Sequence, residues 1–205
     1  MKTNLKPKQK GFTLVEIAIV LVIIGLLLGG VLKGQELIRS AKIKGEASQI
    51  DGYKAGYFGY IDRYGYKPGD DPTQATRWTD MTNGGGNGDI NGGTCSSDTD
   101  ESCLAMRALY HSGFIKGDGT VKQPKPLDKL GGKVHLFTGT YYGQRGVWLY
   151  HEGYVDKDIL TELDKKIDDG KCNSGAMTSW TTNNAYCDQT TGAYKRNGYF
   201  VTKID

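Results

Sequence analysis

The sequence lacks the motifs that mark the common catalytic sites. It has no G-x-S-x-G nucleophile elbow, no H-E-x-x-H metal helix and no phosphate-binding P-loop. His111, His135 and His151 show no metal-ligand spacing, and we expect His135, in a strand pattern, to be half-buried. The acidic pairs 70–71 and 168–169 are consecutive, so their side chains point in different directions. The sequence nominates no catalytic residue, and we predict a protein that is not an enzyme.

A strong charge of one sign is also absent. The formal net charge is +3, from 26 Lys and Arg against 23 Asp and Glu. Four of the Lys precede Gly11, and without them 22 basic side chains face 23 acidic ones. No basic stripe remains that would bind phosphates through counterion release. The composition therefore indicates no nucleic-acid partner.

Proline and a signal-peptidase site are missing from the long apolar run near the N-terminus. Between Phe12 and Leu32, only Thr13 and Glu16 are polar. These 21 residues rise about 31 Å as a helix, enough to cross the hydrocarbon core of a bilayer. No A-x-A-like cleavage site follows the run. We therefore expect it to stay on the protein as an anchor, with the basic leader in the cytoplasm and the remaining chain outside.

The junction before this run resembles the processing signature of type IV prepilins and pseudopilins. The stretch Gly11-Phe12-Thr13-Leu14-Val15-Glu16 follows a short basic leader and precedes a long apolar helix. The resemblance implies that a prepilin peptidase cuts between Gly11 and Phe12 and N-methylates Phe12. It implies a structural subunit of a type IV pilus-like filament, major or minor, with a type II secretion pseudopilin as the alternative.

The resemblance also implies partners and a location. The partners are other pilin-like subunits or copies of the chain in a filament, a prepilin peptidase, an inner-membrane assembly platform and the lipid bilayer. The chain would cross the inner membrane once, with a periplasmic head, and would enter a periplasmic or cell-surface filament. The sequence does not separate adhesion, motility, DNA uptake and secretion. A membrane-anchored periplasmic binding module that does not polymerise is an alternative of another class.

Glu16 is the one carboxylate in the apolar run, roughly 6 Å of helix rise beyond Phe12. A charge inside a membrane is costly and usually functional. In an isolated subunit the carboxylate could extend toward the lipid headgroups. In a filament, the resemblance favours a pair with the α-amino group of Phe12 on a neighbouring subunit. This second interpretation makes Glu16 an assembly residue, because an unpaired desolvated charge costs several kcal/mol.

The pattern along the chain predicts an α+β fold of the type IV pilin kind. We expect a leader at 1–11, a transmembrane and polymerisation helix at 12–33, an amphipathic half of that helix at 34–66 and a globular head at 67–205. Pro68 should end the helix by Lys67. One face of the amphipathic half, with Lys54 filling a gap, carries Ile43, Ala47, Ile50, Tyr57, Ile61 and Tyr64.

The head is predicted to pack this helix on a small antiparallel sheet. Two strands are expected within 133–142 and 145–154, around a turn that contains glycine, and a last edge strand within 198–204. A short helix within 101–114 should be closed by Gly113, and a second helix should follow Asp156 as its N-cap.

Residues 79–100 form a long polar loop that is too rich in glycine to build a core. Asn87, Asp89, Asn91 and Asp98 have partial EF-hand spacing, but Asn replaces Asp at the first place and Asp replaces Glu at the twelfth. Two interpretations stay open: a calcium site that uses Asp89, Asn91 and Asp98, and a loop without a ligand, which these departures favour. We expect no other cofactor.

Four cysteines in an exported domain imply disulfides. Three pairings are possible, and the nearest-neighbour choice is Cys95–Cys103 with Cys172–Cys187. Each of these would close a loop in a region with little core of its own. Zinc is the competing interpretation, but the sequence has no C-x-x-C pair.

Overall fold

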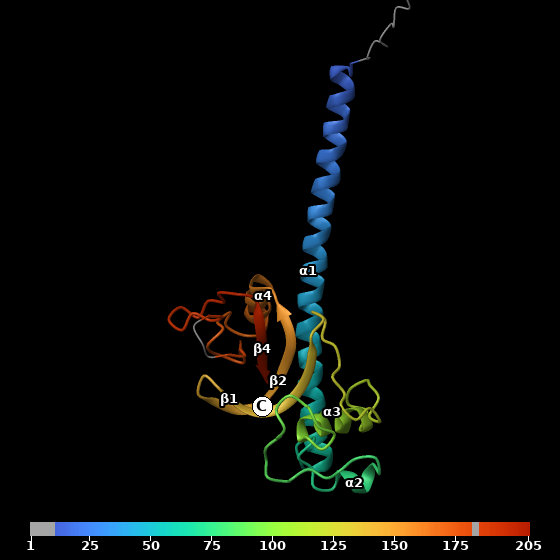
Figure 1. Ribbon diagram of the computed structural model, residues 1–205, viewed down its shortest axis with the longest axis vertical. Coiled ribbons are helices and arrows are strands. Elements are labelled where there is room, and N and C mark those ends of the chain that lie inside the picture. The colour runs from blue at the N-terminus through green and yellow to red at the C-terminus, as the bar shows by residue number, and fades with distance from the viewer. Residues whose placement is uncertain (1–10, 182–184) are drawn as a thin grey trace, which may run out of the picture. The chain divides into compact units, whose positions relative to one another are not determined.

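The computed structural model describes residues 11–181 and 185–205, so the predicted leader lies outside the described residues except for Gly11. The chain divides into two compact units, one that ends at Ser40 and one from Ala41 to Asp205. The elements, in chain order, are α1 (Leu14–Tyr64), α2 (Gln74–Arg77), α3 (Glu101–His111), β1 (Lys133–Tyr141), β2 (Gln144–Val155), α4 (Lys157–Ile167), β3 (Met177–Ser179) and β4 (Gly198–Lys203) (Figure 1). A long apolar helix followed by a small antiparallel sheet confirms the predicted α+β fold of the type IV pilin kind.

Helix α1 runs for 51 residues and ends where the sequence predicts. After Tyr64 the chain leaves the helix at Gly65, whose φ of +78° suits glycine, and Pro68 follows. The residues from Gly11 to Lys33 are exposed, whereas from Ile43 onward one face of the helix is buried. The second half of α1 therefore belongs to the same compact unit as the sheet. The predicted domain borders at 33 and 66 stay predictions.

The buried face of α1 differs from the predicted stripe at several positions. Tyr53, and not Lys54, fills the gap between Ile50 and Tyr57, and Lys54 is only partly buried. A tyrosine one position earlier keeps the three-residue step and places a large apolar ring in the core, which a lysine ammonium could not enter unpaired. Glu46, Gly56 and Tyr60 are also buried, although the stripe did not contain them.

The four strands form one antiparallel sheet in the order β1-β2-β4-β3. The predicted hairpin between β1 and β2 is confirmed, with Tyr141 paired to Gln144 across a two-residue turn. Both turn residues, Tyr142 and Gly143, have positive φ, at 48° and 80°, as a type I′ turn requires. This turn fixes the register of the longest strands in the head.

Both faces of the sheet are buried. The inner face places Val134, Leu136, Val147 and Leu149 in one core with α1, α3 and α4, as their alternation predicts. The outer face carries an aromatic cluster, in which Phe137, Trp148 and Tyr150 pack with Val201 and are flanked by Tyr141 and Trp180.

His135 lies on this outer face and is fully buried, so the half-buried prediction was wrong. Its ring lies 5.0 Å from that of Tyr150 and 6.1 Å from that of Phe137. Burial lowers the pKa of His135 to about 4, with smaller contributions from the charges of Lys125 and His151. The imidazole is therefore neutral at physiological pH and packs as an aromatic ring.

The C-terminal strand is not an edge strand, contrary to the prediction. β4 lies between β2 and β3, because β3 pairs Met177 with Thr202 and Ser179 with Phe200. Sequence periodicity cannot reveal a strand of three residues inside a cysteine-bounded loop. The two predicted helices of the head are confirmed as α3 and α4, and the Asp156 carboxylate accepts the Asp158 N–H at 2.8 Å as the N-cap of α4.

Candidate processing and assembly site

The first turn of α1 is closed by a reciprocal capping pair, Thr13 and Glu16. The helix starts at Leu14, so Thr13 is its N-cap and Glu16 its third residue. The backbone N–H and the hydroxyl of Thr13 each donate to Oε2 of Glu16 at 2.8 Å. The backbone N–H of Glu16 donates back to the Thr13 hydroxyl at 3.2 Å. This is a capping box, whose T-x-x-E signature before an apolar run was present in the sequence and was missed.

The capping box gives the Glu16 carboxylate a local partner in the isolated chain. A negative charge in the first helical turn is also favoured by the helix dipole. The Thr13 amide that Glu16 binds is one residue from the nitrogen of Phe12, which the predicted cleavage would turn into an α-amino group. The carboxylate is therefore already placed at the end of the chain where that amine would appear.

The predicted cleavage junction is not covered by any of the described residues. Gly11, Phe12 and Thr13 precede the helix and have no regular secondary structure. Phe12 is 83% exposed, and a Cβ built on Gly11 would meet no atom of the described residues within 4 Å. An exposed extended backbone is the form in which a peptide bond enters a protease site.

The apolar half of α1 is uncovered along its length. Helix α1 is long and apolar enough to cross a membrane. None of its most apolar stretch is buried inside the described structure. Leu14 is 90% exposed, and Leu26 is 73% exposed. A continuous apolar surface of this size is not left in water, so lipid or other protein must cover it.

The helix continues through four glycines on this apolar half, Gly25, Gly29, Gly30 and Gly34. A Cβ at each of them would meet nothing within 4 Å among the described residues. They form two small-xxx-small pairs, which allow the backbones of neighbouring helices to approach closely in a membrane. Each also weakens the helix by about 1 kcal/mol relative to Ala, which favours local melting outside a bilayer.

The Gly-rich loop of the head is organised by two carboxylates. Asp70 accepts the backbone N–H of Asn87 at 2.9 Å and of Gly88 at 2.7 Å. Glu101, at the start of α3, accepts the N–H of Gly85 at 2.6 Å and the N–H of Asn91 at 2.8 Å. These bonds satisfy the amides of a segment that has no helix or strand of its own.

The three candidate calcium ligands of this loop are engaged separately. Asp89 pairs with Arg145 at 2.5 Å, Asn91 donates its amide to Glu101 at 2.8 Å, and Asp98 pairs with Lys122 at 3.2 Å. Neither of the groups of described residues whose ligand atoms could share an ion contains Asp89 or Asp98. The calcium site stays a prediction, and these partners do not support it.

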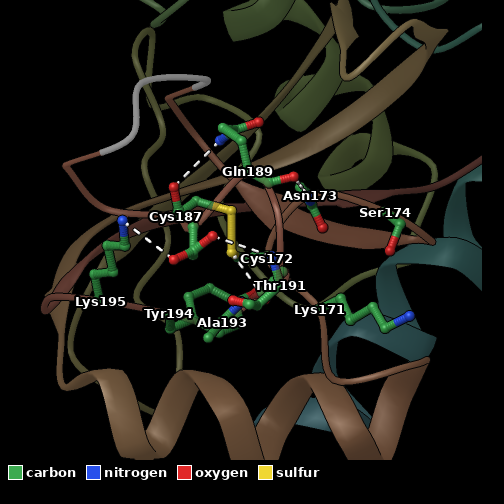
Figure 2. Close-up of a disulfide and its surroundings, with 12 residues drawn as sticks. Lys171, Cys172, Asn173, Ser174, Cys187, Gln189, Thr191, Ala193, Tyr194 and Lys195 are labelled. Atoms are coloured by element: carbon green, nitrogen blue, oxygen red, sulfur yellow. Dashed lines mark hydrogen bonds and ion pairs between the residues drawn. A yellow bond between two sulfur atoms is a disulfide. The ribbon is translucent and has the colours of Figure 1, made fainter.

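The structure joins Cys95 to Cys103 and Cys172 to Cys187, the nearest-neighbour pairings. The second disulfide fastens the C-terminal loop of the head, by which we mean the described residues between α4 and β4, 168–181 and 185–197 (Figure 2). Around it, the Cys172 N–H donates to the carbonyl of Gly192 at 2.9 Å, and Lys195 pairs with Asp188 at 3.3 Å. The disulfide and these polar contacts hold a segment that contributes few side chains to the core.

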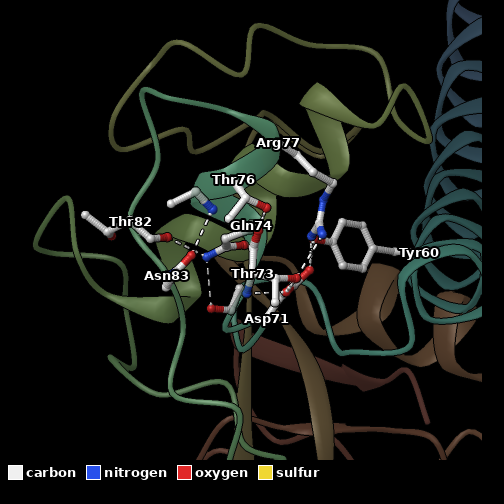
Figure 3. A network of polar contacts seen from close by, with 10 residues as sticks. Tyr60, Asp71, Thr73, Gln74, Thr76, Arg77, Thr82 and Asn83 are labelled. Carbon is white, nitrogen blue, oxygen red and sulfur yellow. Dashed lines mark hydrogen bonds and ion pairs between the residues drawn. The ribbon is translucent and has the colours of Figure 1, made fainter.

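A polar network fastens the end of α1 to the segment that follows it (Figure 3). The Tyr60 hydroxyl donates to Oδ2 of Asp71 at 2.9 Å, and the Arg77 guanidinium pairs with the same carboxylate. Both the N–H and the hydroxyl of Thr73 donate to the other oxygen, Oδ1. Burial alone would raise the pKa of Asp71, but these hydrogen bonds and the Arg77 charge hold it below its ordinary value. This network is structural.

A group of three acidic side chains lies at the end of α4. Asp164, Asp168 and Asp169 have oxygens within 4.8 Å of one another. Each carboxylate already accepts a hydrogen bond from the protein. The Tyr194 hydroxyl donates to Asp164, the Ala176 N–H to Asp168, and the Ser174 hydroxyl to Asp169. We therefore interpret these three acids as structural hydrogen-bond acceptors in the C-terminal region.

The chain matches a family described as the prokaryotic N-terminal methylation motif, over residues 6–32. No curated protein and no solved structure matches the chain. The matched range covers the cleavage junction, the capping pair and the first part of the apolar helix. The type IV prepilin-like signature is thus confirmed.

This motif marks the chain as a pilin-type or pseudopilin-type substrate of a prepilin peptidase. It indicates a structural subunit rather than an enzyme, and it implies pilin-like assembly. Together with the uncovered apolar helix, it indicates a membrane-anchored protein.

Proposed function

We propose that the chain is a structural subunit of a type IV pilus-like filament, a major or minor pilin that assembles from the inner membrane after cleavage between Gly11 and Phe12. The observation that carries the proposal is the position of Glu16, capped on Thr13 at the start of an apolar helix that nothing in the described chain covers. A simple anchor would need the apolar surface, and a neutral glutamine could cap its helix without placing a charge in the membrane.

Assembly would satisfy both features of the helix at once. In the membrane, lipid covers the apolar side chains, and in a filament the helices of neighbouring subunits replace the lipid. The α-amino group of Phe12 on one subunit would then lie in an apolar bundle, where it needs a partner of opposite charge. Glu16 of a neighbour supplies that charge, and the pairing fixes the axial step between subunits.

We propose that the N-terminus lies in the cytoplasm and the head in the periplasm. Four lysines precede Gly11, and positive residues are retained on the cytoplasmic side. The disulfides Cys95–Cys103 and Cys172–Cys187 suit the oxidising periplasm. The filament would therefore grow outward.

A secretion pseudopilin is the second candidate, because the N-terminal segment serves both filaments equally. The head favours the pilus. Its loop at 79–100 and its second disulfide elaborate the part of the subunit that a surface fibre would expose. A periplasmic binding module that does not polymerise is disfavoured by Glu16, which such an anchor would not need.

The proposal is tested with three variants that separate charge from capping. Glu16→Gln removes the charge, but glutamine also serves at the third position of a capping box. Thr13→Ala removes the capping hydroxyl and keeps the charge, at about 0.5–2 kcal/mol of helix stability. Glu16→Ala removes both functions of the glutamate. Each variant is followed by a cleavage blot, by membrane fractionation and by the yield of sheared filaments.

We expect all three variants to be cleaved and inserted, because none adds charge to the apolar run. Glu16→Gln and Glu16→Ala should lose filaments at least tenfold, since an uncompensated buried amine costs about 3–5 kcal/mol at each contact. Thr13→Ala should assemble close to the wild-type level. Normal filaments from Glu16→Gln would show that the glutamate serves only as a cap, and the assembly proposal would then be wrong.

A further inference from the structure

Three ionisable side chains from distant parts of the sequence meet in the interior of the head. They are Glu46 of α1, Asp128 of the loop before β1, and His151 of β2, and all three side chains are fully buried. Nδ1 of His151 lies 3.2 Å from Oε1 of Glu46 and 3.3 Å from Oδ2 of Asp128. The three atoms lie within 4.8 Å of one another.

Backbone amides hold each carboxylate by the oxygen that faces away from the histidine. Oε2 of Glu46 accepts the Lys129 N–H at 2.7 Å. Oδ1 of Asp128 accepts the N–H of Leu130 at 2.8 Å and of Gly132 at 2.7 Å. The remaining oxygens, Oε1 and Oδ2, are thereby aimed at His151. Such orientation of ligand carboxylates by a second layer of hydrogen bonds is typical of metal sites.

The imidazole is oriented by packing. The ring of His151 stacks on that of Phe200, with centroids 3.9 Å apart and planes inclined by 12°. Its Nε2 has no hydrogen-bond partner among the described residues, so the stacking and the Nδ1 side define the position of the ring. Within the described part of the chain, Oε1 of Glu46 has no hydrogen-bond partner, and its polar contact is the 3.2 Å approach of Nδ1 of His151.

A proton on Nδ1 of His151 does not by itself explain why the two carboxylates lie beside the imidazole. Charge-assisted N–H···O bonds are about 2.7–2.9 Å long, and both separations exceed that range. One proton on Nδ1 also leaves two buried carboxylates with only one positive charge, a net charge of −1 that is costly in the interior. A divalent cation bound to two carboxylates and a neutral imidazole makes the site neutral.

The separations also fit a metal ion. Bonds of about 2.0–2.2 Å to a tetrahedral ion place neighbouring ligand atoms about 3.3–3.6 Å apart, and the nitrogen–oxygen separations of 3.2 and 3.3 Å lie at or just below the lower end of this range. We propose that Glu46, Asp128 and His151 bind a divalent transition metal ion of the zinc class, which fastens the second half of α1 to the sheet. The imidazole ligand argues against calcium and magnesium, which prefer oxygen. This proposal does not depend on whether the subunit builds a pilus or a pseudopilus.

The wild-type chain provides the first test. Full-length protein in detergent micelles is treated with a chelator, dialysed, and titrated with Zn²⁺ and with Co²⁺, with Ca²⁺ as competitor. We expect one equivalent of Zn²⁺ per chain, visible Co²⁺ absorption bands typical of four-coordinate sites, and no displacement by millimolar Ca²⁺. No saturable binding of Zn²⁺, or displacement by Ca²⁺, would overturn the proposal.

Two variants then locate the ion. Glu46→Gln keeps an oxygen for the Lys129 N–H while removing a charged ligand, and it should weaken Zn²⁺ binding at least tenfold. Asp169→Asn is the matched control, because Asp169 belongs to the other acidic group, at the end of α4. Circular dichroism checks that both variants are folded. Unchanged affinity in Glu46→Gln, or loss of binding in Asp169→Asn, would show that the ion binds elsewhere.

Discussion

The buried carboxylate of Asp164 accepts a hydrogen bond from the hydroxyl of Tyr194 at 2.7 Å. Asp164 belongs to α4, and Tyr194 lies in the C-terminal loop that the second disulfide fastens. Burial raises the pKa of Asp164 to about 7, and the charges of Asp169 and Asp168 add to this effect. The bonds from Tyr194 and from the Gly170 N–H work in the opposite direction without cancelling it.

This raised pKa predicts that Asp164 destabilises the fold above neutral pH. The folded carboxyl keeps its proton up to about pH 7, whereas the unfolded one loses it near pH 4, so the free energy of unfolding falls as the pH rises between these values. Asp164→Asn should remove this fall and stabilise the protein by about 1–3 kcal/mol at pH 8, with little gain at pH 4. Thermal unfolding at several pH values measures the difference.

Comparison with a variant isolates this carboxyl from other titrating groups. His135, with a pKa lowered to about 4, acts in the opposite direction, because its unfolded form binds a proton that its folded form does not. Asp158→Asn is the control, since Asp158 is exposed on the same helix. An Asp164→Asn curve parallel to the wild-type curve would contradict the assignment.

Two glycines of α1 should respond in opposite ways to the same substitution. A Cβ on Gly59 would lie 2.6 Å from Cε1 of Phe114, whose ring also packs under the Arg63 guanidinium at 4.5 Å. A Cβ on Gly52 would meet no described atom within 4 Å. Gly59→Ala should therefore destabilise the head by about 1 kcal/mol, because displacing Phe114 outweighs the gain in helix propensity.

Gly52→Ala is the matched control and should stabilise the head by about 0.5–1 kcal/mol through helix propensity alone. Thermal unfolding of both variants in the same detergent compares them. Equal effects of the two substitutions would mean that the contact between Gly59 and Phe114 does not constrain the helix.

The disulfide Cys172–Cys187 should matter for local order in the C-terminal loop. Replacing both cysteines by serine should cost about 2–5 kcal/mol and expose this loop to protease first. Peptide mapping without reductant should recover Cys95–Cys103 and Cys172–Cys187 in the wild-type protein. Crossed pairs, or free thiols in protein from the periplasm, would contradict the pairing.

The local elements of the fold could be predicted because their signals are short in range. Pro68 sets the limit before which α1 ends, Asp156 caps α4, and alternating apolar residues define the inner face of the hairpin. The capping pair of Thr13 and Glu16 had an equally local signature. The same carboxylate also has a membrane depth and a proposed partner on a neighbouring subunit, and neither of these depends on the cap.

The features that depend on tertiary contacts could not be predicted. The aromatic cluster buries the second face of the hairpin, so His135 became a core residue although its neighbours in sequence gave no sign of it. The proposed metal ligands Glu46, Asp128 and His151 show no spacing motif, since they come from a helix, a loop and a strand. Only the packing of α1 on the sheet brings them together.

The mature protein should begin with N-methyl-Phe12, because the exposed Gly11–Phe12 junction lies within the matched methylation motif. N-terminal mass spectrometry of membrane-extracted protein measures this directly. An intact Met1 or a cut after Leu32 would contradict the processing prediction, and the latter would indicate an ordinary secretory signal.

A variant pair tests why glycine stands at the junction. Gly11→Val adds a β-branched side chain where the backbone must lie extended in the peptidase, and we expect the uncut form to accumulate at least tenfold. Thr13→Ala changes the neighbouring cap but leaves the junction open, so it should be processed at the wild-type rate. A pulse-chase blot compares the two. If Gly11→Val is cut normally, exposure of the junction alone is sufficient for cleavage; if Thr13→Ala is not cut, the peptidase requires the capped start of α1 as well as the glycine.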